Sequence, residues 1–147
     1  SVAEVFEGDD TGRAAIGHGY TYSGHPVGAA AALACLAETK RLNVVENAAA
    51  RGAQLWVGIN RLKDKYSAIG DVRGGHGLML AIELVADRDT KSAPPKAQPG
   101  QVQAAAYAAG AMVRVSGPNI ILSPPLVLTQ ADAETILSAL DAGFAVL

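Results

Sequence analysis

The sequence is poor in cysteine: Cys35 is the only one in 147 residues, so no disulfide can form within the chain. A chain without disulfides suits a reducing compartment, and we expect a cytoplasmic protein. Positive charge is not in excess, because 12 Lys and Arg stand against 14 Asp and Glu, for a formal charge of −2. This balance provides no basic surface for nucleic acid.

The sequence also has no long hydrophobic run. Its longest apolar stretch, 27–37, is rich in Ala and Gly and shorter than the roughly 20 apolar residues that span a bilayer. Residues 1–13 lack a basic start followed by an apolar run, so they do not resemble a signal peptide. The first residue is not Met and the opening is polar and unpatterned, so we expect this chain to be part of a longer protein.

Half of the residues are hydrophobic and 18% are charged, a composition typical of one globular domain. Helices are predicted at 26–40, at 43–66, at 101–109 and from 129 onward. Strands are predicted at 78–85, 111–115 and 120–122, the last two joined as a hairpin by a longer loop, while 71–77 is a predicted turn and 86–100 a surface loop. This order predicts an α+β fold, with a short antiparallel sheet and helices packed on one face.

The first predicted helix is unusual in its composition. Pro26 suits a first helical turn, where its missing N–H costs nothing. The stretch that follows is apolar on nearly all sides, so we expect the helix to be buried on nearly all sides, with Cys35 as a small core residue.

The other helices carry clearer end signals and faces. Asn43 with Glu46 resembles a capping pair, as does Thr129 with Asp132. In the second helix the apolar residues repeat at helical spacing and predict its buried face. They are Leu55, Ile59, Leu62 and Tyr66.

The segment GHGYTYSGHP, residues 17–26, is the first candidate site. Three successive residues with hydroxyl groups, Tyr20 to Tyr22, are followed by Ser23 just before a predicted helix N-terminus. Free backbone N–H groups at a helix N-terminus bind phosphate, and hydroxyl groups add donors. The alternative is a hydroxyl-rich turn that only caps the helix, which is common.

Arg114 is the second candidate, because it interrupts the apolar stretch AMVRV. Its planar guanidinium suits bidentate binding of a carboxylate. The alternatives are a salt bridge with Glu83 or Asp71, or a side chain that faces outward. Arg73 and Glu83 themselves are interpreted as structural.

The three histidines, His18, His25 and His76, do not indicate a metal site. No cysteine or acidic cluster accompanies them at a ligand spacing. Local hydrogen bonding is the better interpretation, and we expect no metal.

Four segments together resemble one family of enzymes. They are HGYTYSGHPVGAAAAL, DVRG, GLMLAIELVAD and RVSGPNIILSPPL, and they follow one another from His18 onward. In this order they resemble the C-terminal part of class III aminotransferases, which depend on pyridoxal 5'-phosphate (PLP). The Ser23-Gly24-His25-Pro26 form is similar to the amine–pyruvate and ω-amino acid–pyruvate branch, whereas acetylornithine and glutamate-semialdehyde relatives have Asn at His25. His76 departs from the family, which usually has an apolar residue there.

The resemblance assigns roles to three residues. Thr21 matches a threonine that binds the PLP phosphate of the neighbouring subunit, which implies a homodimer with a shared site. Tyr20 matches an aromatic residue that helps line the substrate site. Arg114 matches an arginine that binds the carboxylate of an amino or keto acid and swings away when an uncharged amine occupies the pocket.

The resemblance also implies what this chain does not contain. PLP chemistry needs a lysine that forms a Schiff base with the cofactor, and an acidic partner for its pyridine nitrogen. The lysines, at 40, 63, 65, 91 and 96, all lie in polar or helix-end settings. In the family both groups belong to a large domain, which we expect to precede this segment. Residues 1–25 would then be the dimer-crossing cofactor loop region and 26–147 the small C-terminal domain of a fold-type I enzyme.

The implied activity is transfer of an amino group from an amine or ω-amino acid to pyruvate, with this chain alone inactive. Two alternatives stay open at this point. One is a non-catalytic α+β module that binds a ligand or a protein partner. The other is a different class III PLP enzyme, such as an aminomutase or decarboxylase.

Overall fold

The computed structural model describes residue 4 and residues 19–147. His18, and most of the polar opening of the chain, lie outside the described residues. The chain divides into two compact units, Ser1–Glu38 and Thr39–Leu147. No helix in the described part of the chain is both long and apolar enough to cross a membrane.

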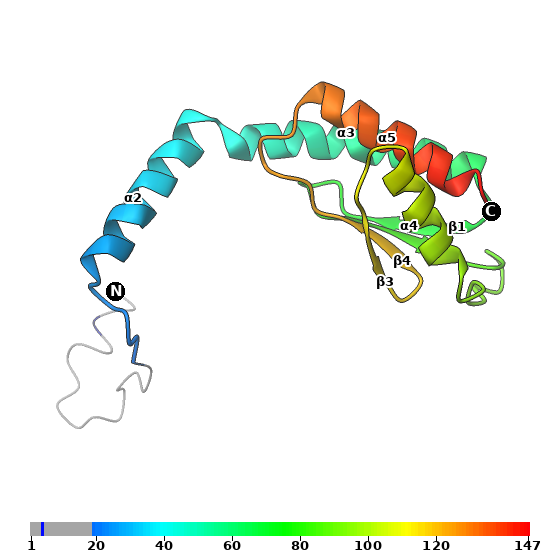
Figure 1. Cartoon of the computed structure of the whole chain (residues 1–147), viewed down its shortest axis with the longest axis horizontal. Helices are drawn as coiled ribbons and strands as arrows, with labels where there is room; N and C mark the ends of the chain where they lie inside the picture. The colour runs from blue at the N-terminus through cyan, green and yellow to red at the C-terminus, as the bar shows by residue number, and fades with distance from the viewer. Residues whose placement is uncertain (1–3, 5–18) are drawn as a thin grey trace. The chain divides into compact units, whose positions relative to one another are not determined.

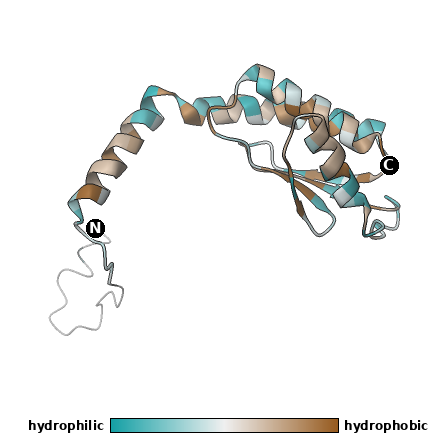
Figure 2. Ribbon diagram, viewed as in Figure 1, coloured by the Kyte–Doolittle hydropathy of each residue, from teal (hydrophilic) through white to brown (hydrophobic). Residues whose placement is uncertain are grey.

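The first unit contains most of helix α2, Pro26–Arg41 (Figure 1). The helix begins at Pro26, as predicted, and Lys40 and Arg41 in its last turn suit the negative end of the helix dipole. Pale and brown colouring over most of its length in Figure 2 reflects its Ala- and Leu-rich composition.

The prediction that this helix is buried is wrong for the chain as described. None of the residues of α2 is buried, and Leu33 and Leu36 are 69% and 65% exposed. Cys35 is exposed as well, so it is not a core residue here. The composition indicates a helix that favours apolar surroundings, but the covering surface does not come from the described residues.

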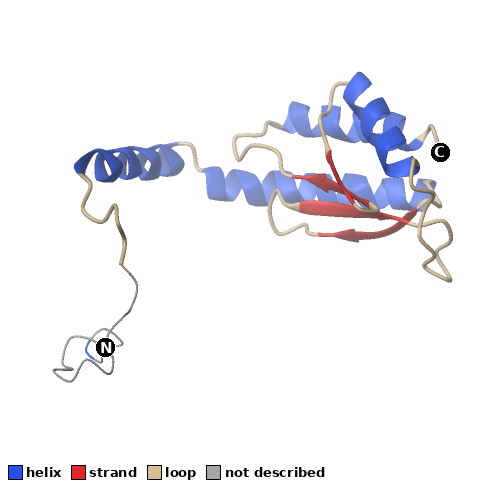
Figure 3. Ribbon diagram, turned by 60° about the horizontal axis from the view of Figure 1, so that its bottom comes forward, coloured by secondary structure: helices blue, strands red, loops and turns tan. Residues whose placement is uncertain are grey.

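The second unit is an α+β domain (Figure 3). Its helices are α3 (Val44–Lys65), α4 (Gln98–Ala108) and α5 (Gln130–Phe144). Its strands are β1 (Ile69–Arg73), β2 (Leu80–Leu84), β3 (Arg114–Ser116) and β4 (Asn119–Leu122). They form one antiparallel sheet in the order β1-β2-β4-β3.

Only one face of this sheet is buried. In β2 the buried residues Leu80, Ile82 and Leu84 alternate with partly exposed ones, and β4 alternates in the same way. Helix α3 contacts β1, α4 contacts β3 and β4, and α5 packs between the other two helices. The predicted sheet with helices on one face is therefore confirmed.

The core lies between this face and the helices. Its fully buried members include Leu55 and Ile59 of α3, Ile82 of β2 and Phe144 of α5. Leu62 is buried and Tyr66 packs against the same cluster, which confirms the predicted face of α3. Truncating a buried Leu or Ile to Ala costs about 2–5 kcal/mol, a large part of the stability of a domain.

Three local predictions need correction. The turn predicted at 71–77 contains the end of β1, a strand that was not predicted from the sequence. Helix α4 begins at Gln98, inside the predicted loop, with Pro99 in its first turn. Asn43 precedes α3 in the left-handed conformation, φ 47°, and its side chain makes no capping bond. Asn tolerates this conformation better than most residues, so it serves here as a bend in the backbone rather than as a cap.

Two other predicted features hold. Thr129 and Asp132 form a reciprocal capping box at the start of α5. Residues 114–122 form a hairpin, although its turn is tighter than expected, because Ser116 already pairs with Asn119. Gly117 adopts φ 58°, which glycine supplies without strain at the first central position of a two-residue turn.

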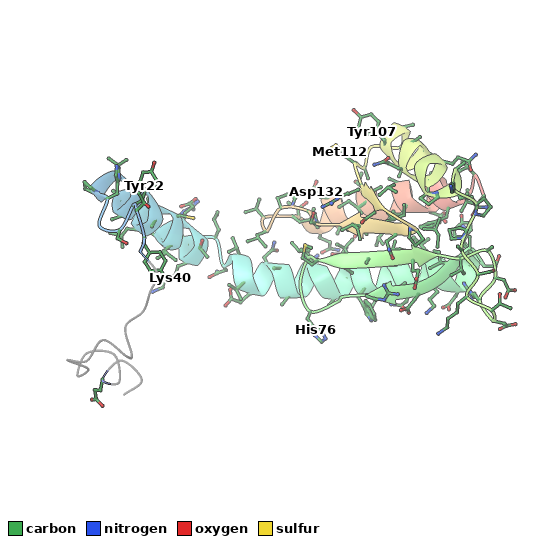
Figure 4. All side chains as sticks on the ribbon, turned by 90° about the horizontal axis from the view of Figure 1, so that it is seen from below. Tyr22, Lys40, His76, Tyr107, Met112 and Asp132 are labelled. Carbon is green, nitrogen blue, oxygen red and sulfur yellow. The ribbon has the colours of Figure 1, made fainter. Side chains whose placement is uncertain are left out.

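The turn between β1 and β2 is packed through glycines. A side chain on Gly52 of α3 would come within 2.3 Å of the Gly77 carbonyl oxygen, and one on Gly75 would meet the ring of Trp56 at 2.8 Å. His76 stands exposed between these contacts (Figure 4). A histidine at position 76 therefore leaves the packing of the turn on α3 in place.

A polar cluster joins the end of α3 to α5. The Tyr66 hydroxyl donates to Asp141 Oδ1 at 2.7 Å, and Lys65 Nζ lies 2.6 Å from the same oxygen. Hydrogen bonds from Lys65 and Tyr66, together with the charge of Lys65, lower the pKa of the Asp141 carboxyl. The charged form of Asp141 therefore stabilises the folded state.

We predict that this contribution disappears in acid. A carboxyl whose pKa is lower when folded stabilises the protein above its unfolded pKa, about 3.9, and loses that effect as the pH falls through its folded value. The wild type should exceed Asp141→Asn in free energy of unfolding near pH 7, and the difference should shrink below about pH 4. Urea unfolding across this range measures it. Asp64→Asn is the control, because Asp64 is exposed and forms no ion pair with the described residues. A difference that stays constant with pH would contradict the assignment.

Candidate functional site

The segment before α2 folds as two successive turns. Ser23 N–H donates to the Tyr20 carbonyl at 2.9 Å, and His25 N–H donates to the Tyr22 carbonyl at 3.1 Å. Gly24 between them adopts φ 73°, which favours glycine. Thr21 lies within the first turn, directly after Tyr20.

The cap of α2 is His25, not a hydroxyl group. His25 Nδ1 accepts the Gly28 N–H at 3.2 Å, and the His25 carbonyl accepts the Ala29 N–H at 2.9 Å. This confirms local hydrogen bonding as the role of His25. The hydroxyl groups of Thr21 and Ser23 make no hydrogen bond in the described part of the chain, so the interpretation of them as helix caps is wrong.

The turn presents these groups outward. Tyr20 and Tyr22 are 70% and 82% exposed, and Thr21 is also exposed. Residues 19–23 line one open hollow. Within the described residues, the amide groups of Thr21 and Tyr22 donate to no backbone carbonyl. A hydroxyl group and neighbouring N–H donors on an exposed glycine-flanked turn fit a phosphate.

Arg114 opens β3 in the second unit. Its side chain is exposed, and within the described residues it makes no hydrogen bond or ion pair. The proposed partners are engaged elsewhere: Glu83 pairs with Arg73, and Asp71 pairs with Arg73 and Lys63. The salt-bridge alternative for Arg114 is therefore wrong, and the pairing of Arg73 with Glu83 agrees with structural roles for both.

A cavity of about 580 Å³ borders Arg114. Its lining is mainly apolar and comes from α4, the stretch that leads into β3, the end of β4 with the loop after it, and helix α5. The main lining residues are Gln103, Met112, Arg114, Ile121, Pro124 and Leu128. One cation at the rim of an apolar cavity suits a molecule with a carboxylate and an apolar part.

Two side-chain amides hold the walls of this cavity. Gln103 Nε2 donates to the Val113 carbonyl at 2.8 Å. Asn47 Nδ2 donates to the carbonyls of Leu126 and Leu128 at 2.8 and 3.0 Å. Neither residue was predicted from the sequence, because a bond from a side chain to a distant backbone carbonyl leaves no periodic signal.

Among the described residues no cluster of His, Cys, Asp and Glu is arranged to hold a metal ion.

The candidate residues are divided between the two units. Thr21 and Tyr20 belong to the first unit, and Arg114 belongs to the second.

Comparison with known proteins gives a consistent result. A family model described as aminotransferase class-III matches residues 1–144. The solved structure of an amine transaminase from an uncultivated Pseudomonas species, in a PLP-bound form, is 44% identical, with a TM-score of 0.88 over 98% of this chain. Taurine–pyruvate aminotransferase of Bilophila wadsworthia is 36% identical over 84% of this chain, and leucine/methionine racemase of Thermococcus litoralis is 35% identical over 86%.

This chain spans only part of those proteins. It covers 28% of the length of the Bilophila protein and 33% of the Pseudomonas chain. The similarity therefore concerns one segment, and most of each relative has no counterpart in the 147 residues.

The cap of α2 leads to a testable prediction. His25→Ala removes the acceptor for the Gly28 N–H, and the loss of an N-cap costs about 0.5–2 kcal/mol. Amide exchange of Gly28, followed by NMR, should accelerate. His25→Asn should retain slow exchange, because Asn is a strong N-cap. Equal exchange rates in the wild type and His25→Ala would show that the His25 cap has no energetic weight.

Proposed function

Because the chain belongs to the class III aminotransferases, whose cofactor is PLP, we propose that the protein containing it transfers an amino group from an amine or ω-amino acid to pyruvate. The observation that carries this proposal is the exposed guanidinium of Arg114, which has no ion-pair partner among the described residues and lies at the rim of an apolar cavity. The names of the Pseudomonas and Bilophila relatives support the amine donor and the pyruvate acceptor, respectively.

Arg114 resolves a conflict between the two substrates. A keto acid needs a cation for its carboxylate, whereas an uncharged amine places an apolar group in the same space. A guanidinium held by no internal ion pair can bind the carboxylate in one half-reaction and turn to solvent in the other. The apolar lining of the cavity then accommodates the rest of either substrate.

Thr21 is the proposed phosphate ligand. Its hydroxyl donates to the cofactor phosphate of a neighbouring subunit, which makes the active protein a homodimer, and Tyr20 beside it lines the substrate site. The exposure of this turn and the uncommitted Thr21 hydroxyl support these roles. When bound, PLP acts as the electron sink of the reaction and carries the amino group between the two half-reactions.

The lysine that binds the cofactor is proposed to come from another part of the protein. Lys63 and Lys65 are engaged by Asp71 and Asp141, respectively. Lys40, Lys91 and Lys96 are exposed, and no described lysine lines the hollow at 19–23 or the cavity beside Arg114. This supports assigning the chemistry at the cofactor to a large domain outside this chain. Residues 1–25 are then the proposed cofactor loop region and 26–147 the proposed small domain. We therefore expect this chain alone to be inactive.

A second reaction requires a direct assay, because the family is not uniform. The similar Thermococcus protein is named a leucine/methionine racemase, so a reaction without an amino acceptor is the second candidate. Following both alanine formation from pyruvate and change of optical rotation of a single amino acid separates the two reactions. Membership in the family weighs against the separate non-catalytic module.

The test of the function is Arg114→Ala in the intact aminotransferase. Loss of a charge-assisted pair costs about 1.5–3 kcal/mol, so KM for pyruvate and alanine should rise roughly ten- to hundredfold. The single-turnover rate with an aromatic or alkyl amine, followed by cofactor absorbance, should change little. Arg61→Ala is the control, since Arg61 is exposed on the polar face of α3. If both half-reactions fall equally, Arg114 is structural.

A further prediction concerns Thr21→Ala in the same protein. Losing one hydrogen bond to a charged phosphate should weaken PLP binding by about 1.5–3 kcal/mol, without a change of substrate preference. Fluorescence titration of the apoenzyme with PLP measures this, with Ser23→Ala as the neighbouring hydroxyl control. A mixed dimer can be made from one Thr21→Ala subunit and one subunit that lacks the cofactor lysine. One of its sites retains both residues and should be active, whereas the other lacks both and should be inactive. Unchanged PLP affinity would refute the phosphate role.

A further inference from the structure

The backbone just before Arg114 is held by packing and hydrogen bonds, whereas the Arg114 side chain is exposed and makes no ion pair within the described residues. Val113 and Ala111, just before β3, are only 6% and 5% exposed. The end of α4 is closed by a bond from the Ala111 N–H to the Ala106 carbonyl at 2.9 Å, with Gly110 at φ 102°. Met112, between the two buried residues, is 85% exposed, as its position in Figure 4 illustrates.

Gln103 provides a further connection between α4 and β3. Its side chain is partly buried, and its Nε2 donates to the carbonyl of Val113, the residue directly before Arg114. Gln103 also lines the cavity that Arg114 borders. A single side chain therefore holds the peptide group that carries Arg114.

The hydrogen bond from Gln103 lies where it can affect the position of Arg114. Strand β3 is three residues long and lies at the edge of the sheet, with β4 as its one neighbour among the described strands. The carbonyl of Val113 precedes the strand, so the ladder with β4 does not include it. Because Arg has a long side chain, a small rotation of the preceding peptide is magnified at the guanidinium. Misplacing a binding group by about 1 Å can cost about a hundredfold in rate.

We propose that Gln103 is a positioning residue that sets the carboxylate-binding geometry of Arg114. The proposal rests on the proposed function, because it acts through Arg114. Gln103 holds the base of the arginine in one place, and the side chain beyond it moves between substrate and solvent. Gln103 thereby tunes the affinity for the keto acid without taking part in the amine half-reaction.

The experiment uses the intact aminotransferase with Gln103→Leu, which removes the donor at similar size. KM for pyruvate should rise roughly three- to tenfold, while kcat at saturating pyruvate and the single-turnover rate with an amine stay within about twofold. Gln103→Glu should raise KM further, because its carboxylate cannot donate to the Val113 carbonyl and offers Arg114 an internal partner. Gln101→Leu is the matched control, since Gln101 is exposed on the same helix.

A double substitution separates positioning from direct contact. In an Arg114→Ala background, Gln103→Leu should have no additional effect on KM for pyruvate, because the arginine through which it acts is gone. An undiminished effect in that background would overturn the proposal, as would equal losses in both half-reactions of Gln103→Leu. If Arg114→Ala raises KM and Gln103→Leu does not, only this inference fails. If Arg114→Ala itself leaves KM unchanged, the proposed function and this inference fail together.

Discussion

The structure of the second unit depends on burial of one face of a small antiparallel sheet. Ile82 at its centre is fully buried, and Leu55 and Ile59 of α3 are buried in the same core. With every helix of this unit on one side, the other face is free to carry polar and charged groups. Arg73, Asp71 and Glu83 pair there, and Arg114 lies in register with Ile121 on that face. The division between apolar and polar faces makes an exposed arginine possible in an otherwise apolar stretch.

The two candidate regions, one in each unit, leave their polar groups exposed in different ways. In the first unit His25 caps α2, and the Thr21 hydroxyl makes no hydrogen bond within the described residues. In the second unit Asp71 and Glu83 pair with Lys63 and Arg73, and Arg114 makes no ion pair with the described residues. In both cases another residue makes the structural contact, and the candidate residue makes none within the described residues.

Periodicity and end signals predicted much of the fold. The spacing of Leu55, Ile59 and Leu62 identified the buried face of α3, and Thr129 with Asp132 identified the start of α5. Strand β1 escaped prediction because Gly70 is weakly β-forming, Asp71 is charged, and an irregularity between Ile69 and Asp71 disrupts the alternation.

The candidate site was less accessible to local reasoning. Local patterns marked the segment 17–26 and Arg114 as candidates, but they fitted plainer structural roles equally well. Only the resemblance to a family assigned specific roles to Thr21, Tyr20 and Arg114. Gln103 and Asn47 were missed entirely, since their partners are backbone carbonyls that any sequence provides. The apolar composition of α2 led to the prediction that the helix is buried. Burial also requires a surface that covers the helix, and the sequence of the helix does not reveal one.

The tight turn at Gly117 and Pro118 also determines which face of the sheet Arg114 occupies. Successive side chains of a strand point to opposite faces, so Arg114 and Val115 face opposite sides of the sheet. The pairing of Ser116 with Asn119 determines which of the two meets the core. Gain or loss of one codon in an exposed loop is usually tolerated. At this hairpin a one-residue shift of the register would turn Arg114 toward Ile120 and the core and leave Val115 at the cavity, so the placement of Arg114 depends on the length of the turn.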